Sequence, residues 1–209
     1  MITALTLFAA SSAMLTVRAE YLGPPRDVYI FKPLTVVLII LIALDAKNPA
    51  SQFYRYAIIA GLVCSLAGDV FLMLPSDKFI HGLSSFLVAH VCYIAAFVSE
   101  GGREVCWPCA IPFLVYGGGM LRLLWPHLGK MKTPVLIYMF VILLMAWAAV
   151  SRWRMTAQSG SLLAMTGALL FCASDSILAV NRFKGRFSSA QLLILSTYFV
   201  AQWLIALST

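Results

Sequence analysis

The chain has 209 residues, of which 62% are hydrophobic and only 11% are charged. Soluble domains carry about 25% charged residues, so this composition excludes a soluble globular protein and predicts an integral membrane protein. The net charge of +7 is typical of a membrane protein whose basic loops face acidic lipid head groups. No basic run with interleaved aromatic residues indicates a nucleic-acid partner.

Apolar segments of about 17–21 residues can cross a hydrocarbon core about 30 Å thick. Eight apolar segments follow one another, which predicts one all-α domain over residues 1–209, a bundle of eight transmembrane helices. The first segment has no basic residue before Arg18, unlike a cleavable signal peptide, so we expect it to be retained. The second is short; we expect it to extend back into residues 29–31 or to tilt little, with Pro33 in its first turn, where proline is tolerated. The segments are 2–17, 33–44, 54–74, 79–99, 108–124, 133–150, 159–180 and 190–207.

The basic residues are distributed unevenly between the loops. All 15 Lys and Arg are expected in loops or at helix ends; ten follow odd-numbered segments and five follow even-numbered ones. Loops rich in Lys and Arg face the cytoplasm. We therefore expect both termini outside a bacterial inner membrane and the active site towards the cytoplasm. The five in even-numbered loops are Lys47, Arg55, Arg103, Arg152 and Arg154.

Residues 61–72 resemble residues 167–178, at an offset of 106 residues. The third and seventh segments are then equivalent and run in the same direction, which indicates a possible 4+4 parallel internal repeat. Chance similarity between apolar helices is the alternative. The matching pairs are Gly61 and Gly167, Ala67 and Ala173, Asp69 and Asp175, Leu72 and Leu178, and, further on, Lys78 and Lys184.

Asp69 and Asp175 are the only acidic residues within the predicted spans. An ionised carboxylate at membrane depth costs several kcal/mol unless it is paired or solvated, which marks both residues as candidates for function. Each lies about five residues from its helix end, roughly 7–8 Å below the interface, so the two can face one cavity. Two neighbouring carboxyls in a low dielectric favour one protonated and one charged form, as acid/base catalysis needs. The alternative is that each Asp caps a helix or pairs with a loop cation.

Other polar residues are candidates for the same site. His90 lies in the middle of the fourth segment, with Tyr93 one turn later; a packing histidine is the alternative. Lys32, Asn181 and Arg182 are expected at the same interface as the two aspartates, where they can hold a phosphate or lipid head group, unless they are ordinary positive-inside charge. No His-x-x-x-His or Cys/His cluster occurs, so we expect no metal and no cofactor.

Cys106-Trp-Pro-Cys109 has the C-x-x-C spacing of thioredoxin-type redox motifs. The motif lacks the βαβ context in which this spacing is informative, and no second cysteine pair accompanies it. A membrane thiol-oxidoreductase is therefore the weakest of the readings, and the sequence leaves open whether the two cysteines form a disulfide.

A set of motifs, in order along nearly the whole chain, resembles the YhhN family, the transmembrane lysoplasmalogenases. The resemblance implies an eight-helix enzyme that hydrolyses the vinyl ether bond of lysoplasmenylethanolamine or lysoplasmenylcholine. The products are a fatty aldehyde and glycerophosphoethanolamine or glycerophosphocholine. The motifs are Phe31-Lys32-Pro33-Leu34, residues 61–75 with Gly68-Asp69, Ala89-His90-x-x-Tyr93, residues 167–171 with Ser174-Asp175, Asn181-Arg182-Phe183, and Tyr198 with Ala201-Gln202.

The resemblance implies that the family's paired aspartates are Asp69 and Asp175, and the chemistry of the reaction suggests roles for the site residues. A vinyl ether is opened by protonation of its β-carbon, and water captures the resulting oxocarbenium ion, so a protonated Asp can act as acid and its ionised partner as stabiliser and base. The expected partners are a lysophospholipid substrate and membrane lipids, with no obligatory protein partner. The alternative function is a small proton-coupled transporter or lipid-binding protein that uses the same two Asp. The expected catalytic residues are Asp69, Asp175 and His90, and the expected substrate-binding residues are Lys32, Tyr93, Asn181, Arg182, Tyr198 and Gln202.

Overall fold

The computed structural model describes residues 1–46, 49–101 and 106–209. Within this part of the chain, eight helical segments are long and apolar enough to cross a membrane, which confirms the predicted all-α bundle. The helices are α1 (Ile2–Leu22), α2 (Pro25–Leu44), α3 (Gln52–Met73), α4 (Phe79–Ser99), α5 (Ile111–Leu124), α6 (Lys132–Thr156), α7 (Ser159–Ala179) and α8 (Ala190–Leu207). Short 3-10 turns flank α5 (η1, Trp107–Ala110; η2, Trp125–His127; η3, Gly129–Met131), and a π-helix, η4 (Val180–Lys184), extends α7.

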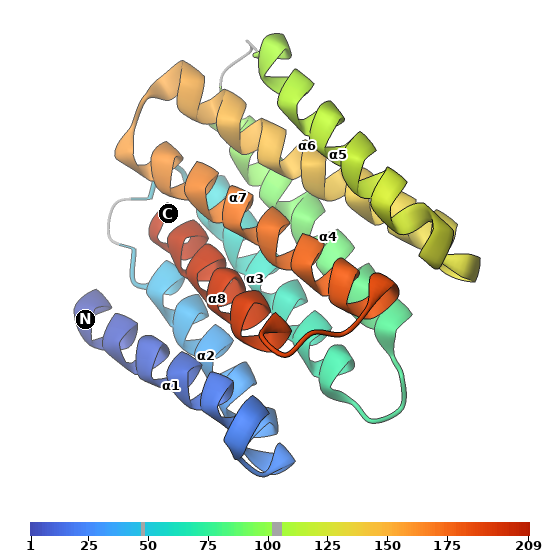
Figure 1. Ribbon diagram of the computed structural model, residues 1–209. Helices are drawn as coiled ribbons and strands as arrows, with labels where there is room; N and C mark the ends of the chain where they lie inside the picture. The colour runs from blue at the N-terminus through green and yellow to red at the C-terminus, as the bar shows by residue number, and fades with distance from the viewer. Residues whose placement is uncertain (47–48, 102–105) are drawn as a thin grey trace.

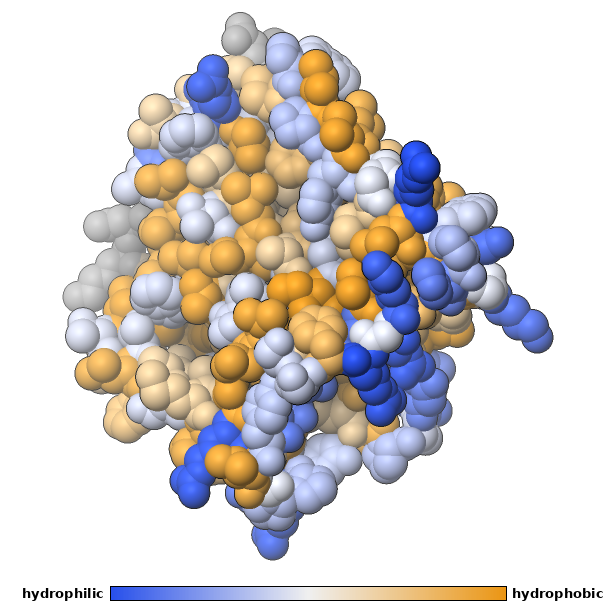
Figure 2. Space-filling model, viewed as in Figure 1, coloured by the Kyte–Doolittle hydropathy of each residue, from blue (hydrophilic) through white to orange (hydrophobic). Residues whose placement is uncertain are grey.

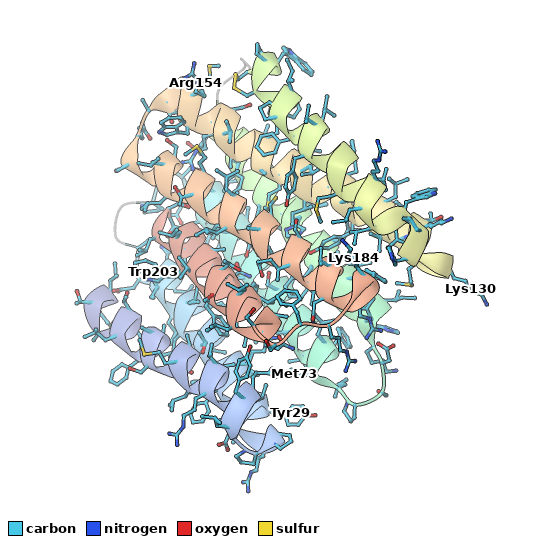
Figure 3. The ribbon with its side chains drawn as sticks, viewed as in Figure 1. Tyr29, Met73, Lys130, Arg154, Lys184 and Trp203 are labelled. Carbon is cyan, nitrogen blue, oxygen red and sulfur yellow. A yellow bond between two sulfur atoms is a disulfide. The ribbon has the colours of Figure 1, made fainter. Side chains whose placement is uncertain are left out.

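Successive helices run in opposite directions, so the connections alternate between the two ends of the bundle (Figure 1). Residues 23–24, 74–78, 125–131 and 180–189 lie at one end, here called the mouth end, and both termini lie at the other. Figure 3 shows Lys130 and Lys184 at the mouth end and Arg154 at the opposite end. Hydrophobic residues cover much of the face seen in Figure 2, and many hydrophilic ones gather near the mouth end.

Helix α8 lies at the centre of the arrangement, since it contacts α1, α2, α3 and α7. Helix α3 packs against α4 along its length because glycine stands where rings of α4 approach. A Cβ on Gly61 would lie 2.3 Å from the Tyr93 ring, and one on Gly68 would lie 2.7 Å from the Phe86 ring. Small residues of this kind let membrane helices approach closely. This packing fixes the rotation of α3 about its axis and therefore the side of the helix from which Asp69 projects.

Helix α2 begins at Pro25, eight residues before the predicted start, so the prediction that Pro33 occupies the first turn is wrong. Pro25 holds that place, and Pro33 lies inside the helix. An internal proline lacks the backbone donor for the carbonyl four residues earlier, which is here that of Tyr29. In the same turn, the hydroxyls of Ser12 and Thr35 both donate to the Phe31 carbonyl. Because α2 begins at Pro25, Lys32 lies two turns inside a membrane helix.

Helix α6 continues to Thr156, past the predicted end at residue 150. The prediction of a loop position for Arg152 is therefore wrong, because this residue lies within α6 and is 2% exposed. Its guanidinium donates to the Tyr54 hydroxyl at 2.7 Å and lies over the Tyr54 ring at 4.3 Å. Lys47 and Arg103, which enter the predicted topology, lie outside the described residues, and the orientation in the membrane remains a prediction.

Cys106 and Cys109 form a disulfide at the turn that precedes α5. The Trp147 indole donates to the Cys106 carbonyl at 2.9 Å, and the Trp107 ring packs on the Trp147 ring. These contacts join the start of α5 to α6 at the end of the bundle that carries the termini. The disulfide therefore lies at the opposite end from the mouth.

Candidate active site

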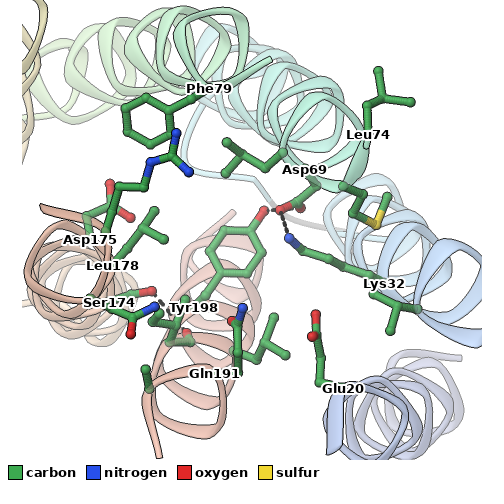
Figure 4. Close-up of a pocket in the computed structure, with 18 of the residues that line it drawn as sticks. Glu20, Lys32, Asp69, Leu74, Phe79, Ser174, Asp175, Leu178, Gln191 and Tyr198 are labelled. Carbon is green, nitrogen blue, oxygen red and sulfur yellow. Dashed lines mark hydrogen bonds and ion pairs between the residues drawn. The ribbon is translucent and has the colours of Figure 1, made fainter. Parts of the chain in front are cut away.

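A cavity of about 690 Å³ opens at the mouth end, and both Asp69 and Asp175 line it. Its walls come from α1, α2, α3, α7 and α8, together with the residues at the start of α4. Figure 4 shows Asp69 on one side of the cavity and Asp175 on the other, with Tyr198 between them. Two carboxyl groups that are far apart in the sequence thus share one pocket.

Asp69 is held by two partners and is nearly buried, since its side chain is 2% exposed. Lys32 Nζ lies 3.0 Å from Oδ1, and the Tyr198 hydroxyl donates to Oδ2 at 2.5 Å. Figure 4 shows both contacts as dashed lines. The predicted site residues Lys32 and Tyr198 therefore meet at Asp69, and the carboxylate forms an ion pair within the membrane region.

Asp175 has a different set of partners. The Tyr138 hydroxyl donates to its Oδ2 atom, and His90 Nε2 lies 3.7 Å from the same oxygen. His90 Nε2 also lies 2.9 Å from the Tyr138 oxygen, so Asp175, Tyr138 and His90 form one connected chain. Tyr138 was not among the predicted site residues. The signal that could have indicated it is its spacing, because Tyr138 follows Lys32 by the same 106 residues that separate the two aspartates.

Three predicted site residues lie behind the cavity wall. Tyr93 donates to Gln202 Oε1 at 2.7 Å, and the Gln202 amide donates to the Tyr198 hydroxyl at 3.2 Å. This chain of bonds fixes the ring of Tyr198, which in turn contacts Asp69. His90 is fully buried, and its ring meets Phe171 edge to face at 4.8 Å. Tyr93, Gln202 and His90 therefore position the groups that reach the cavity.

The mouth of the cavity carries charges of both signs. Arg182 forms an ion pair with Asp77 at 2.6 Å, and its guanidinium lies 5.0 Å from the centre of the Phe79 ring. Asn181 lies next to it in η4, and its side-chain oxygen accepts a hydrogen bond from the Phe187 amide at 3.2 Å. Three further charged residues, which the sequence analysis did not assign to the site, line the cavity: Glu20, Lys78 and Arg186.

Apolar space adjoins this polar cavity. A small pocket of about 50 Å³ lies beside Asp175 and Tyr138, and its other lining residues are apolar. A separate groove of about 210 Å³ lies between α1, α2 and α8, with Trp203 at its edge. The site therefore places carboxyl groups between a charged mouth and a hydrophobic interior, an arrangement suited to an amphipathic ligand.

The fold and the site define a multi-pass integral membrane protein with a paired-carboxyl cavity at one end of a helical bundle. The sequence profile of the YhhN family matches residues 28–209, and the chain belongs to this family. No solved structure matches the chain.

Three relatives illustrate the range of the similarity. The membrane protein YhhN of Escherichia coli O157:H7 is 30% identical over 94% of each chain. Lysoplasmalogenase TMEM86A of Bos taurus is 36% identical over 72% of this chain, which spans 64% of that relative's length. A lysoplasmalogenase of Mycobacterium bovis is 28% identical over 69% of this chain and 56% of its own.

Proposed function

We propose that this protein is a lysoplasmalogenase, which hydrolyses the vinyl ether bond of lysoplasmenylethanolamine or lysoplasmenylcholine. The products are a fatty aldehyde and glycerophosphoethanolamine or glycerophosphocholine. The observation that carries the proposal is the meeting of Asp69 and Asp175 in one cavity between a charged mouth and apolar space. The names of the bovine and mycobacterial relatives support the same substrate class.

The reaction requires an acid, a negative charge and a base. Protonation of the β-carbon of the vinyl ether produces an oxocarbenium ion, which a water molecule captures to give a hemiacetal that collapses to aldehyde and alcohol. A pair of carboxyls can supply a proton, stabilise the cation and accept a proton from water. Asp69 and Asp175 form such a pair, so the reaction needs no further acid or base.

The charges around the cavity suggest how the substrate lies. Lys32 is engaged by nearly buried Asp69, so we assign the phosphate of the head group to the more accessible cations of the mouth, Arg182, Arg186 and the half-buried Lys78. The Asp77 partner of Arg182 is itself exposed, so this ion pair can open towards a phosphate. Asn181, beside Arg182, can donate from its amide nitrogen because its oxygen is engaged by Phe187. The alkenyl chain then extends towards the apolar space beside Asp175. With the predicted topology, the mouth faces the cytoplasm.

The shape of the cavity is more consistent with a hydrolase than with a transporter. A transporter that works by alternating access needs a path towards both membrane faces. The described residues that line the cavity come from the mouth half of the bundle, and none belongs to the segment from residue 99 to 158. We therefore favour a hydrolase over proton-coupled transport.

The test is release of aldehyde from lysoplasmenylethanolamine by purified protein in detergent micelles. Wild type should release aldehyde, whereas Asp69→Asn and Asp175→Asn should each reduce turnover by about 10²-fold or more, the usual contribution of acid/base groups. Asp45→Asn is the matched control, because Asp45 ends α2 at the opposite end of the bundle and should leave the rate unchanged. Absence of aldehyde from wild type, under conditions in which the bovine relative is active, would refute the proposed substrate.

A further inference from the structure

The two aspartates are held in equivalent ways by residues of different chemistry. Lys32 and Tyr138 are separated by 106 residues, as are Asp69 and Asp175, and each lies on the helix that precedes its aspartate. The second partner of each aspartate comes from the fourth helix of the other half: Tyr198 of α8 contacts Asp69, and His90 of α4 lies near Asp175. The same framework thus presents a cation to one carboxyl and a neutral hydroxyl to the other.

The charges identify the carboxyl that carries a proton. Lys32 balances the charge of Asp69 within the bundle. Among the described residues, no lysine or arginine forms an ion pair with Asp175. An uncompensated carboxylate at membrane depth is costly, whereas a protonated carboxyl is neutral. One lysine for two aspartates therefore favours Asp69 as the anion and Asp175 as the acid.

The hydrogen bonds around Asp175 agree with this assignment. Tyr138 has one hydroxyl proton, which it gives to Asp175 Oδ2, so its oxygen accepts from the Nε2–H group of His90. A neutral imidazole carries a single N–H, and His90 Nδ1 has no hydrogen-bond partner among the described residues. His90 is thus a neutral donor, and Oδ1 of Asp175 is the oxygen left to carry the proton.

The two carboxyls also differ in access to the cavity. Both oxygens of Asp69 are engaged, Oδ1 by Lys32 and Oδ2 by Tyr198, and its side chain is 2% exposed. The Asp175 side chain is 16% exposed, and within the described part of the chain no hydrogen bond engages its Oδ1 atom. The group that is free to give up a proton is therefore the one that reaches the substrate.

We propose that Asp175 is the proton donor and Asp69 the fixed negative charge, an assignment that rests on the proposed hydrolysis. The proton on Asp175 Oδ1 moves to the β-carbon, the π electrons form the new C–H bond, and the ether oxygen shares a lone pair to give the oxocarbenium ion beside ionised Asp69. Water attacks the cationic carbon and returns one proton to Asp175. The hemiacetal then transfers its hydroxyl proton to the ether oxygen as the C–O bond breaks, so the sum is the addition of one water.

The experiment compares two non-hydrolysable lysolipid probes of the same shape. One has a saturated ether in place of the vinyl ether, and the other has a secondary amine, which is protonated at neutral pH and mimics the cationic intermediate. The measurement is the ratio of the two Kd values in detergent micelles. Because each variant serves as its own reference, the ratio reports the charge of the site independently of any general loss of affinity.

Wild type and Asp175→Asn should bind the amine about tenfold or more tightly than the ether, since Asn resembles a protonated Asp and Asp69 stays charged. The double variant Lys32→Met, Asp69→Asn removes both charges without leaving either unpaired, and it should bind the two probes equally. Loss of the preference in Asp175→Asn, or its retention in the double variant, would overturn the assignment, and so would a wild-type ratio near one. Failure of wild type to release aldehyde would instead count against the proposed function, because the ratio does not depend on turnover.

Discussion

Lys32 and Tyr138 lie 106 residues apart in the sequence, as Asp69 and Asp175 do, and each contacts the aspartate of the following helix. The ammonium group of Lys32 compensates Asp69, whereas the Tyr138 hydroxyl donates to Asp175 without adding charge. The two aspartates thus differ in the charge of the partner that the preceding helix supplies. Substitutions at these positions test stability and catalysis separately.

Lys32→Met should destabilise the protein by about 3–5 kcal/mol, because it leaves a buried carboxylate without its cation. The double variant Lys32→Met, Asp69→Asn should recover most of that stability, since neither charge remains. Neither variant should release aldehyde. Thermal unfolding in detergent, followed by circular dichroism, measures the first two effects, and a Lys32→Met protein as stable as wild type would show that the ion pair contributes little.

Tyr138→Phe should lower kcat by about tenfold or more while KM changes little, because it removes the hydrogen bond that orients Asp175 and leaves the mouth unchanged. Tyr116→Phe is the matched control, since Tyr116 donates to Ser176 at 2.6 Å and does not line the cavity. Steady-state kinetics with lysoplasmenylethanolamine separates the two parameters. A rise in KM with kcat unchanged would assign Tyr138 to substrate binding.

Gly61→Ala should destabilise the protein by about 1–3 kcal/mol, the usual cost of overpacking a filled core. The new methyl group would lie 2.3 Å from the ring of Tyr93, whose hydroxyl bond to Gln202 supports Tyr198. Activity should therefore fall together with stability. Gly118→Ala is the control, because a Cβ there meets no other element within 4 Å in the described part of the chain, and its unfolding temperature should stay close to that of wild type.

Arg152→Ala should cost about 2–4 kcal/mol of stability, since it removes a charged donor from Tyr54 and leaves a cavity between α3 and α6. Arg154→Ala, two residues later on an exposed position, should change stability by less than about 0.5 kcal/mol. Unfolding temperatures of the purified proteins compare the two. Equal effects would show that the buried guanidinium has no special structural role.

Much of the architecture could be predicted from the sequence because hydrophobic length and charge position are local properties. The eight helices and the selection of Asp69 and Asp175 follow from the cost of charge in a membrane. The boundaries of α2 and α6 could not be predicted this way, because Lys32 and Arg152 look like loop residues until their partners are known. These partners, Asp69 for Lys32 and Tyr54 for Arg152, come from other helices.

The site was predicted less completely than the fold. Asp69, Lys32 and Tyr198 come together, although Lys32 was expected at the phosphate and not at Asp69. Tyr138 carries no sequence signal of its own, because a tyrosine in an apolar helix is common. Only its distance from Lys32 along the chain distinguishes it. The separation of cavity-lining residues from supporting ones, such as Tyr93 and Gln202, depends on side-chain packing between helices, which no local pattern specifies.

The ion pair between Lys32 and Asp69 also bears on biosynthesis. Helix α2 carries a lysine two turns from its start, and α3 carries an aspartate near its end, so each helix alone would bring an unpaired charge into lipid. A charged residue near a helix centre opposes release from the translocon by about 2.5–3.5 kcal/mol. Because the two helices are consecutive, they can leave the translocon together as a hairpin in which the charges are already paired. The ion pair that holds Asp69 in the cavity would thus also link the membrane insertion of α2 to that of α3.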